Sequence, residues 1–226
     1  MEKDLNKFLQ IIRQEGHNKL AEAAIQHGLS IDRLNKLIHQ NRQIKHLVFE
    51  GLIGDGITRN RSIYWGQCVG EVRDGWGLVY CTDSDNDPHL YECEWDKGTP
   101  VKGREIWIVD NEWRKYEGAF DHEYLQTGTG NVQSEDGSMF EGEWKRGMVH
   151  GRGKGVRANG ESYEGEFQNG RSHGQGRWTY PDGRYEEGQY EDGKKIGVHM
   201  HFSKDGWLIA LLTYKDGQLV NVENIE

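Results

Sequence analysis

The chain has 226 residues, of which 35% are hydrophobic and 29% are charged. Glycine accounts for 31 residues and proline for only 3, while Phe, Trp and Tyr together make up 11%. This much glycine argues against a mainly helical protein, and this many aromatic residues argue against a disordered one. The low hydrophobic content also argues against a thick two-layer core along the whole chain.

The formal net charge of −9 is unevenly distributed. Residues 1–50 carry 8 Lys and Arg against 6 Asp and Glu, whereas residues 51–226 carry 20 against 31. Nucleic acids and anionic lipids are bound by clustered basic side chains. The acidic part of the chain therefore argues against both as partners.

The cysteines and the hydropathy pattern indicate where the protein resides. Cys68, Cys81 and Cys93 are an odd number and show no CxxC spacing, which is typical of reduced thiols. Residues 1–20 carry charges throughout, and no apolar run reaches 18 residues. We therefore expect a cytoplasmic protein with no signal peptide and no transmembrane helix.

The first 48 residues have a helical pattern. Apolar residues in 2–15 fall on one helix face, and a second helix is expected over 19–27, ending at Gly28. A third is expected from Ser30 to about His46, with its apolar positions at Ile31, Leu34, Leu37, Ile38 and Ile44. We favour an N-terminal cap on the following segment, which repeat arrays need; the alternative is that residues 1–46 dock a partner helix.

The middle of the chain repeats with a fixed period. Phe140 and Tyr163 are 23 residues apart, as are Trp144 and Phe167, and glycines recur at the same interval. In a strand, Tyr163, Gly165 and Phe167 would share one face. The Asn-Gly pair at 169–170 and the Asp-Gly pair at 182–183 predict tight turns. Each unit is therefore expected to be a two-stranded hairpin, with glycines that leave room for the rings.

The motif Tyr-Glu-Gly-Glu-Phe-x-x-Gly-x-x-x-Gly-x-Gly, which starts at Tyr163, resembles the MORN repeat family (membrane occupation and recognition nexus). The resemblance extends over residues 64–206 with increasing departures: Cys68 and Glu186 replace aromatic residues, and Cys93 and His199 replace glycines. It implies a mostly β protein, an elongated single antiparallel meander of about six hairpins with a short N-terminal helical segment. The expected divisions are a helical head over 1–48, the array over 49–222 and a tail over 223–226.

The most apolar run of the chain, Trp207 to Tyr214, comes after the last clear repeat. We favour a closing hairpin, buried on both faces or under a helix. The alternative is an edge strand that pairs with a second chain, since unprotected edges invite pairing.

Few residues suggest chemistry, so we expect neither an enzyme nor a cofactor. His199 and His201 share a strand face, but no third metal ligand is implied. An acidic insertion matches four positions of a calcium loop, namely Asp83, Asp85, Asp87 and Glu94. Pro88 stands where such a loop needs Gly, so a solvated acidic turn is favoured.

The best candidate for function is a row of aromatic residues on one sheet face, because interfaces are rich in large aromatic side chains. The row comprises Tyr116, Phe120, Phe140, Trp144, Tyr163, Phe167, Trp178, Tyr180 and Tyr190. The prediction is a non-catalytic scaffold or adaptor that docks a peptide, helix or partner domain on this face. The resemblance implies cytoskeletal, ciliary or membrane-junction assemblies. The alternatives are a phospholipid-binding module and a regulatory subunit of an enzyme supplied by another chain.

Overall fold

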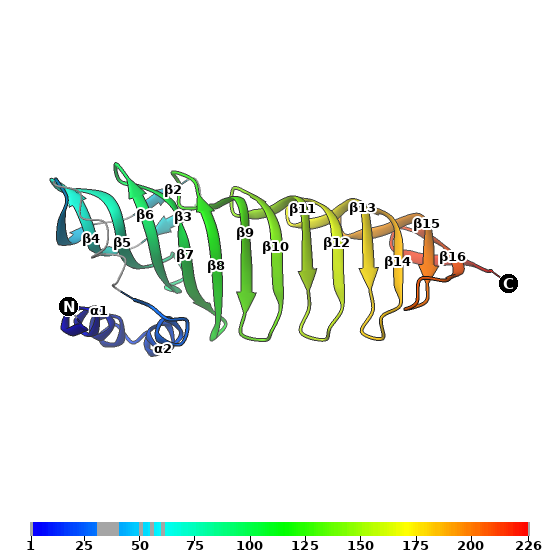
Figure 1. The fold of residues 1–226 in the computed structure, drawn as a ribbon, viewed down its shortest axis with the longest axis horizontal. Helices are drawn as coiled ribbons and strands as arrows, with labels where there is room; N and C mark the ends of the chain where they lie inside the picture. Colours follow the sequence, from blue (N-terminus) through cyan, green and yellow to red (C-terminus); the bar gives the residue numbers. More distant parts are fainter. Residues whose placement is uncertain (1, 31–40, 50–51, 55–56, 60–61, 226) are drawn as a thin grey trace. The chain divides into compact units, whose positions relative to one another are not determined.

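The chain forms one long antiparallel meander. The computed structural model describes residues 2–30, 41–49, 52–54, 57–59 and 62–225. In these, fifteen strands form one sheet in the order β1-β4-β5-β6-β7-β8-β9-β10-β11-β12-β13-β14-β15-β16-β17 (Figure 1). Strands β2 (Leu52–Gly54) and β3 (Ile57–Arg59) form a separate pair. The predicted meander and the N-terminal helical segment are confirmed.

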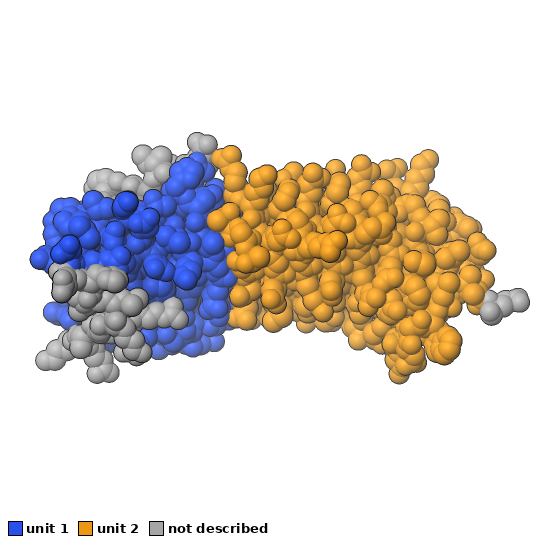
Figure 2. Space-filling view, turned by 45° about the horizontal axis from the view of Figure 1, so that its top comes forward, with its two compact units in different colours: residues 1–126 blue, residues 127–226 orange. Residues whose placement is uncertain are grey.

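The chain divides into two compact units, residues 1–126 (unit 1) and 127–226 (unit 2), coloured separately in Figure 2. Unit 1 begins with α1 (Glu2–Gln14) and α2 (Asn18–Gln26). Its sheet strands are β1 (Gln43–Phe49), β4 (Ser62–Val69), β5 (Val72–Thr82), β6 (Pro88–Asp96), β7 (Thr99–Val109) and β8 (Glu112–Phe120).

Unit 2 holds the regular hairpins. Its strands are β9 (Gln126–Ser134), β10 (Met139–Lys145), β11 (Met148–Val156), β12 (Ser162–Gln168), β13 (Arg171–Thr179), β14 (Tyr185–Glu191), β15 (Lys194–Phe202), β16 (Leu208–Lys215) and β17 (Gln218–Asn224). The turn between β12 and β13 places Asn169 and Gly170 at φ 49° and 81°. Both angles are positive, as expected for a two-residue hairpin turn with an Asn-Gly sequence.

The two helices cover one face of the sheet in unit 1. Apolar residues at the helical spacing, among them Phe8, Ile12 and Leu20, pack with Trp65 and Leu78 in one buried cluster. Because neighbouring strand residues point to opposite faces, Trp65 and Leu78 lie on the face opposite Tyr64 and Val79. This is the only hydrophobic cluster formed jointly by helices and strands in the part of the chain that the structure describes.

The third predicted helix is wrong at its C-terminal end. Residues 31–40 lie outside the described part, but Gln43–Phe49 is a strand paired antiparallel with β4. Ile44, expected on an apolar helix face, lies opposite Gln67 in this pairing and is exposed. The ladder with β4 supplies these residues with backbone partners outside their own segment, which local helical spacing cannot foresee.

The C-terminal hairpin forms, but the expected burial on both faces is wrong. β16 contributes the buried Ala210 and Leu212, whereas all seven residues of β17 are exposed. Trp207, just before β16, is 76% exposed. The described residues of unit 2 include no helix that could cover this hairpin.

Candidate functional site

Alternating residues give the sheet of unit 2 two chemically different faces. The aromatic face carries Phe140, Gly155, Tyr163 and Trp178, which are successive cross-strand partners. The opposite, charged face carries the lateral line Glu141, Lys154, Glu164, Arg177 and Glu187. On the charged face, Lys154 lies 3.4 Å from Glu164 and Arg177 lies 2.5 Å from Glu187. The sequence Glu-Gly-Glu therefore places its glutamates on the side away from the rings.

On the aromatic face, a ring lies over each facing pair of glycines. Gly165 and Gly176 are opposite one another, and a Cβ on Gly165 would lie 2.8 Å from the hydroxyl of Tyr163. Gly142 and Gly153 are paired in the same way beneath Phe140. Only residues without a Cβ permit this approach, which explains the repeated glycines.

The tyrosine hydroxyls at this position are held by the backbone. Tyr163 donates to the carbonyl of Glu166 at 3.0 Å, three residues along the strand. In unit 1, Tyr64 and Tyr116 make the same contact with the residue three positions on, at 2.7 and 3.1 Å. Burial raises the pKa of Tyr163 to about 12. These hydroxyls are fixed hydrogen-bond donors.

Edge-to-face contacts join the rings of unit 2 into an aromatic ladder. Centroid distances are 5.5 Å for Phe140–Trp144, 5.1 Å for Phe140–Phe167, 5.0 Å for Tyr163–Phe167 and 4.9 Å for Tyr163–Tyr190. Contacts of 5.2 Å from Tyr190 to His199 and 5.0 Å from His199 to Tyr214 extend it. Such pairs stabilise by about 0.5–1.5 kcal/mol beyond the area they bury.

The predicted aromatic row separates into buried and half-buried members. Tyr116 and Phe120, both in unit 1, are buried, as are Phe140, Tyr163 and Tyr190 in unit 2. Half-buried members, all in unit 2, are Trp144, Phe167, Trp178 and Tyr180. Only the half-buried rings offer substantial surface to a partner, and the buried ones hold the sheet together.

The departures at Glu186 and His199 compensate each other. Glu186 replaces the aromatic residue, and the imidazole of His199, fully buried, lies over Gly188 where that ring would be. His199 Nε2 lies 2.9 Å from the carbonyl of Gln189, which is three residues after Glu186. It therefore donates to the carbonyl that the tyrosine hydroxyl uses in other units. The ring comes from the return strand instead of the first strand.

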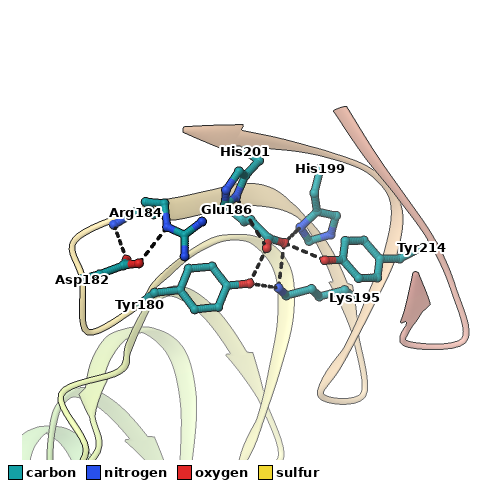
Figure 3. A network of polar contacts seen from close by, with 8 residues as sticks. All are labelled: Tyr180, Asp182, Arg184, Glu186, Lys195, His199, His201 and Tyr214. Atoms are coloured by element: carbon teal, nitrogen blue, oxygen red, sulfur yellow. Dashed lines mark hydrogen bonds and ion pairs between the residues drawn. The ribbon is translucent and has the colours of Figure 1, made fainter. Parts of the chain in front are cut away.

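Glu186, buried on the aromatic face, is the centre of a polar network (Figure 3). Its carboxylate accepts hydrogen bonds from Lys195 Nζ at 2.7 Å, from Tyr214 Oη at 3.0 Å and from the hydroxyl of Tyr180. Burial favours the neutral acid, but the hydrogen bonds from Lys195 and Tyr180 outweigh it and hold the pKa of Glu186 below its ordinary value. The network is thus an ion pair between two aromatic rings, with Lys195 Nζ 5.5 and 5.1 Å from the ring centroids of Tyr180 and Tyr214.

His199 stays neutral in this network. Burial lowers the pKa of His199 below 6.5, and the nearby Lys195 contributes in the same direction. Its Nδ1 lies 4.0 Å from Glu186, and Nδ1 of His201 lies 3.7 Å from the same carboxylate. The third group that sequence analysis lacked beside the two histidines is therefore Glu186. Among the described residues, however, no cluster of three or more His, Cys, Asp or Glu is arranged to hold a metal ion.

Two adjoining concave regions lie on the aromatic side of unit 2. One, of about 410 Å³, is lined by Tyr163, Phe167 and Trp178 among others, and the second, of about 580 Å³, by Trp178, Tyr180 and Tyr214. Both are lined by Arg157, whose guanidinium lies 4.7 Å from the Trp178 ring. We call this the aromatic groove. Its volumes fall in the range of about 300–1,000 Å³ that is typical of ligand pockets.

The groove has basic residues along its rim. Arg171 lines the first region and Lys194 the second, and both are exposed. They occupy equivalent repeat positions, since each begins the strand that follows a turn. The acidic lining residues are Glu161, which pairs with Arg157 at 3.0 Å, and Asp216. Sequence analysis missed Lys195 and Tyr214, because bulges in β14 and β16 shift the strict 23-residue spacing.

The acidic insertion in unit 1 forms a turn. Asp83 Oδ1 accepts backbone hydrogen bonds from Asp85 and Asp87 at 3.0 and 2.9 Å. Its other oxygen lies 3.4 Å from His89, which also lies 2.7 Å from the buried Glu105. Glu94, the last predicted calcium ligand, lies 3.9 Å from Lys102. The Asp83 carboxylate therefore serves the turn and His89, and calcium gains no support.

Comparison with known proteins identifies two repeats. The family model described as MORN repeat matches residues 140–162 and 163–183 in tandem. These are the two units in which the ring-over-glycine arrangement follows the motif without departure. Among curated proteins, no similar sequence was found. None of the described helices is both long enough and apolar enough to cross a membrane.

Proposed function

Because this chain is a MORN-repeat protein, with tandem repeats over residues 140–183, we propose that it is a non-catalytic scaffold or adaptor. A partner protein docks on the aromatic groove of unit 2, within a cytoplasmic assembly such as a cytoskeletal, ciliary or membrane-junction complex. The observation that carries this proposal is the groove, in which Phe167, Trp178 and Tyr180 are half-buried over a rigid sheet.

The groove suits protein binding for two reasons. First, its rings are held in place by the aromatic ladder and lose little conformational freedom when a partner binds. Second, large aromatic and Arg side chains are those that contribute most at interfaces. The charged face of β10–β14 is different, because Lys154 and Arg177 are already paired with Glu164 and Glu187 across neighbouring strands.

Binding to anionic membranes is the second candidate, favoured by Arg171 and Lys194 on the groove rim. Other basic residues are less suitable for it. Lys195 is paired with the buried Glu186, and Arg152 and Lys154 belong to strand positions on the opposite face from Tyr163. Sedimentation with anionic vesicles over a range of salt concentrations tests this alternative: salt-sensitive binding favours it over the pure scaffold.

The main test combines Phe167→Ala with Trp178→Ala in the full chain. We expect partners recovered by affinity purification and quantitative mass spectrometry from native cells to fall by about tenfold or more, as for interface anchors. The matched control is Lys154→Ala with Arg177→Ala, which alters the charged face of the same strands. Thermal unfolding of both variants separates lost binding from lost folding. If the folded aromatic variant keeps the same partners, the groove is not the docking surface.

A further inference from the structure

The last strand of unit 2 is an open edge. In the described sheet, β17 is hydrogen-bonded to β16 and ends the strand order. All seven of its residues are exposed, and Leu219, Val220 and Val222 are exposed by 49%, 59% and 49%. An edge of this kind offers a row of backbone donors and acceptors to another strand.

The backbone groups that face outward can be identified. The N–H of Ile225 donates to the carbonyl of Ile209 at 2.8 Å, so Ile225 points its polar groups towards β16. Val222 and Asn224 lie opposite Leu212 and Ala210 and alternate with the inward-facing residues. In an antiparallel ladder, alternate residues bond to opposite neighbours. The N–H and C=O of Val222 and Asn224 therefore face the open edge.

The usual protections of an edge strand are missing from β17. The strand has no proline, and its one charged residue is Glu223. Proteins commonly shield edges with Lys, Pro or a covering segment. Apolar exposure is also concentrated here: half of the large hydrophobic side chains exposed in the described chain lie between Val198 and Ile225. The end of unit 2 has the character of an interface.

We propose that two copies of this chain pair through β17 as an antiparallel strand pair about a two-fold axis. The strand is self-complementary. Centred on Asn221, it would place Val220 opposite Val222 of the second copy; centred on Val222, it would place Leu219 opposite Ile225. In both registers Glu223 lies opposite Leu219 or Asn221 and not opposite its own copy, so like charges do not meet. This interface is separate from the aromatic groove and does not depend on the proposed scaffold function.

The first experiment uses the unaltered full chain. Sedimentation velocity over two decades of concentration is expected to show a reversible monomer–dimer equilibrium. Amide hydrogen exchange, compared at the two ends of that range, is expected to show protection of Val222 and Asn224 as the dimer forms. A monomer at all concentrations overturns the proposal, as does an open-ended series of larger species. A dimer without protection in β17 assigns the contact elsewhere and also overturns it.

The second experiment compares two exposed valines. Val222→Lys places a charge on the open edge, whereas Val198→Lys places the same charge on β15, which has neighbours on both sides; the wild-type side chains are 49% and 57% exposed. We expect Val222→Lys to weaken the dimer at least tenfold and Val198→Lys to leave it unchanged. Val222→Pro, which removes an outward-facing N–H, is expected to act like Val222→Lys. Equal effects at positions 222 and 198, or none at either, contradict strand pairing.

Discussion

The two units use one hairpin sheet but stabilise it differently. In unit 1, α1 and α2 cover one face and form a hydrophobic cluster with Trp65, Leu78 and Leu90. In unit 2, the corresponding strand positions opposite the rings hold Glu, Lys and Arg, and the aromatic ladder stabilises the sheet. A single-layer sheet is therefore possible when rings and facing glycines pack closely enough on one side. The uncovered layer leaves the aromatic groove accessible.

The largest expected effect concerns the helical layer of unit 1. Leu20→Ala removes a fully buried side chain of α2 and should cost about 2–5 kcal/mol of unfolding free energy. Hydrogen exchange should quicken in β4–β7 while unit 2 keeps its protection. The control on the same helix is Ile25→Ala, because Ile25 is 52% exposed, with an expected change within about 0.5 kcal/mol. Equal loss of protection in both units would show that the helical layer stabilises the whole sheet.

The next effect concerns the ring-over-glycine packing of unit 2. Gly176→Ala would drive a Cβ into the Tyr163 ring, and we expect a loss of about 1–3 kcal/mol by overpacking. Gly155→Ala is the control, since its Cβ would meet its nearest atom, Phe140 Cδ2, at 3.7 Å. That change should be neutral, or stabilising by up to about 1 kcal/mol through the unfolded chain. Urea unfolding measures both, and equal costs would show that backbone conformation, not the ring, selects glycine.

A third prediction tests the exchange of ring and glycine at Glu186 and His199. Glu186→Tyr alone should clash with the imidazole, and His199→Gly alone should leave the glycine pair uncovered. Together they recreate the arrangement of Tyr163 over Gly165 and Gly176. The double variant should therefore be more stable than the sum of the two single changes by about 1 kcal/mol or more. The loss of the Lys195 ion pair occurs in both variants that lack Glu186 and cancels in the cycle. Additive costs would refute the exchange.

The smallest effect is a pH dependence. Burial holds the pKa of His199 below 6.5 in the folded protein, so below that pH the unfolded chain binds more protons and stability falls. Glu186, with its pKa lowered from 4.5, adds a further loss as pH falls below that value. Thermal unfolding from pH about 7.5 to about 5.5 should show a weaker slope for His199→Phe than for wild type. His17, His27 and His46 in unit 1 have lowered pKa values too and supply the remaining slope. Identical slopes would mean that His199 does not titrate differently on folding.

The sequence by itself determined the repeat, the strands and the turns. The 23-residue period, the alternation around Gly165 and the Asn169-Gly170 turn are local signals, because strand faces and hairpin turns depend on adjacent residues. They were enough to predict the hairpins of unit 2 and the space that glycine leaves for rings.

Tertiary structure decided the features that depend on distant pairing. Gln43–Phe49 is a strand because β4 supplies its backbone partners, and β17 is exposed because no described helix of unit 2 covers it. Which rings are buried and which line the groove depends on ring contacts across neighbouring hairpins. The replacement of one ring by His199 needed the cross-strand geometry most of all, since Glu186 and His199 are each only a departure from the motif until Gly188 lies between them.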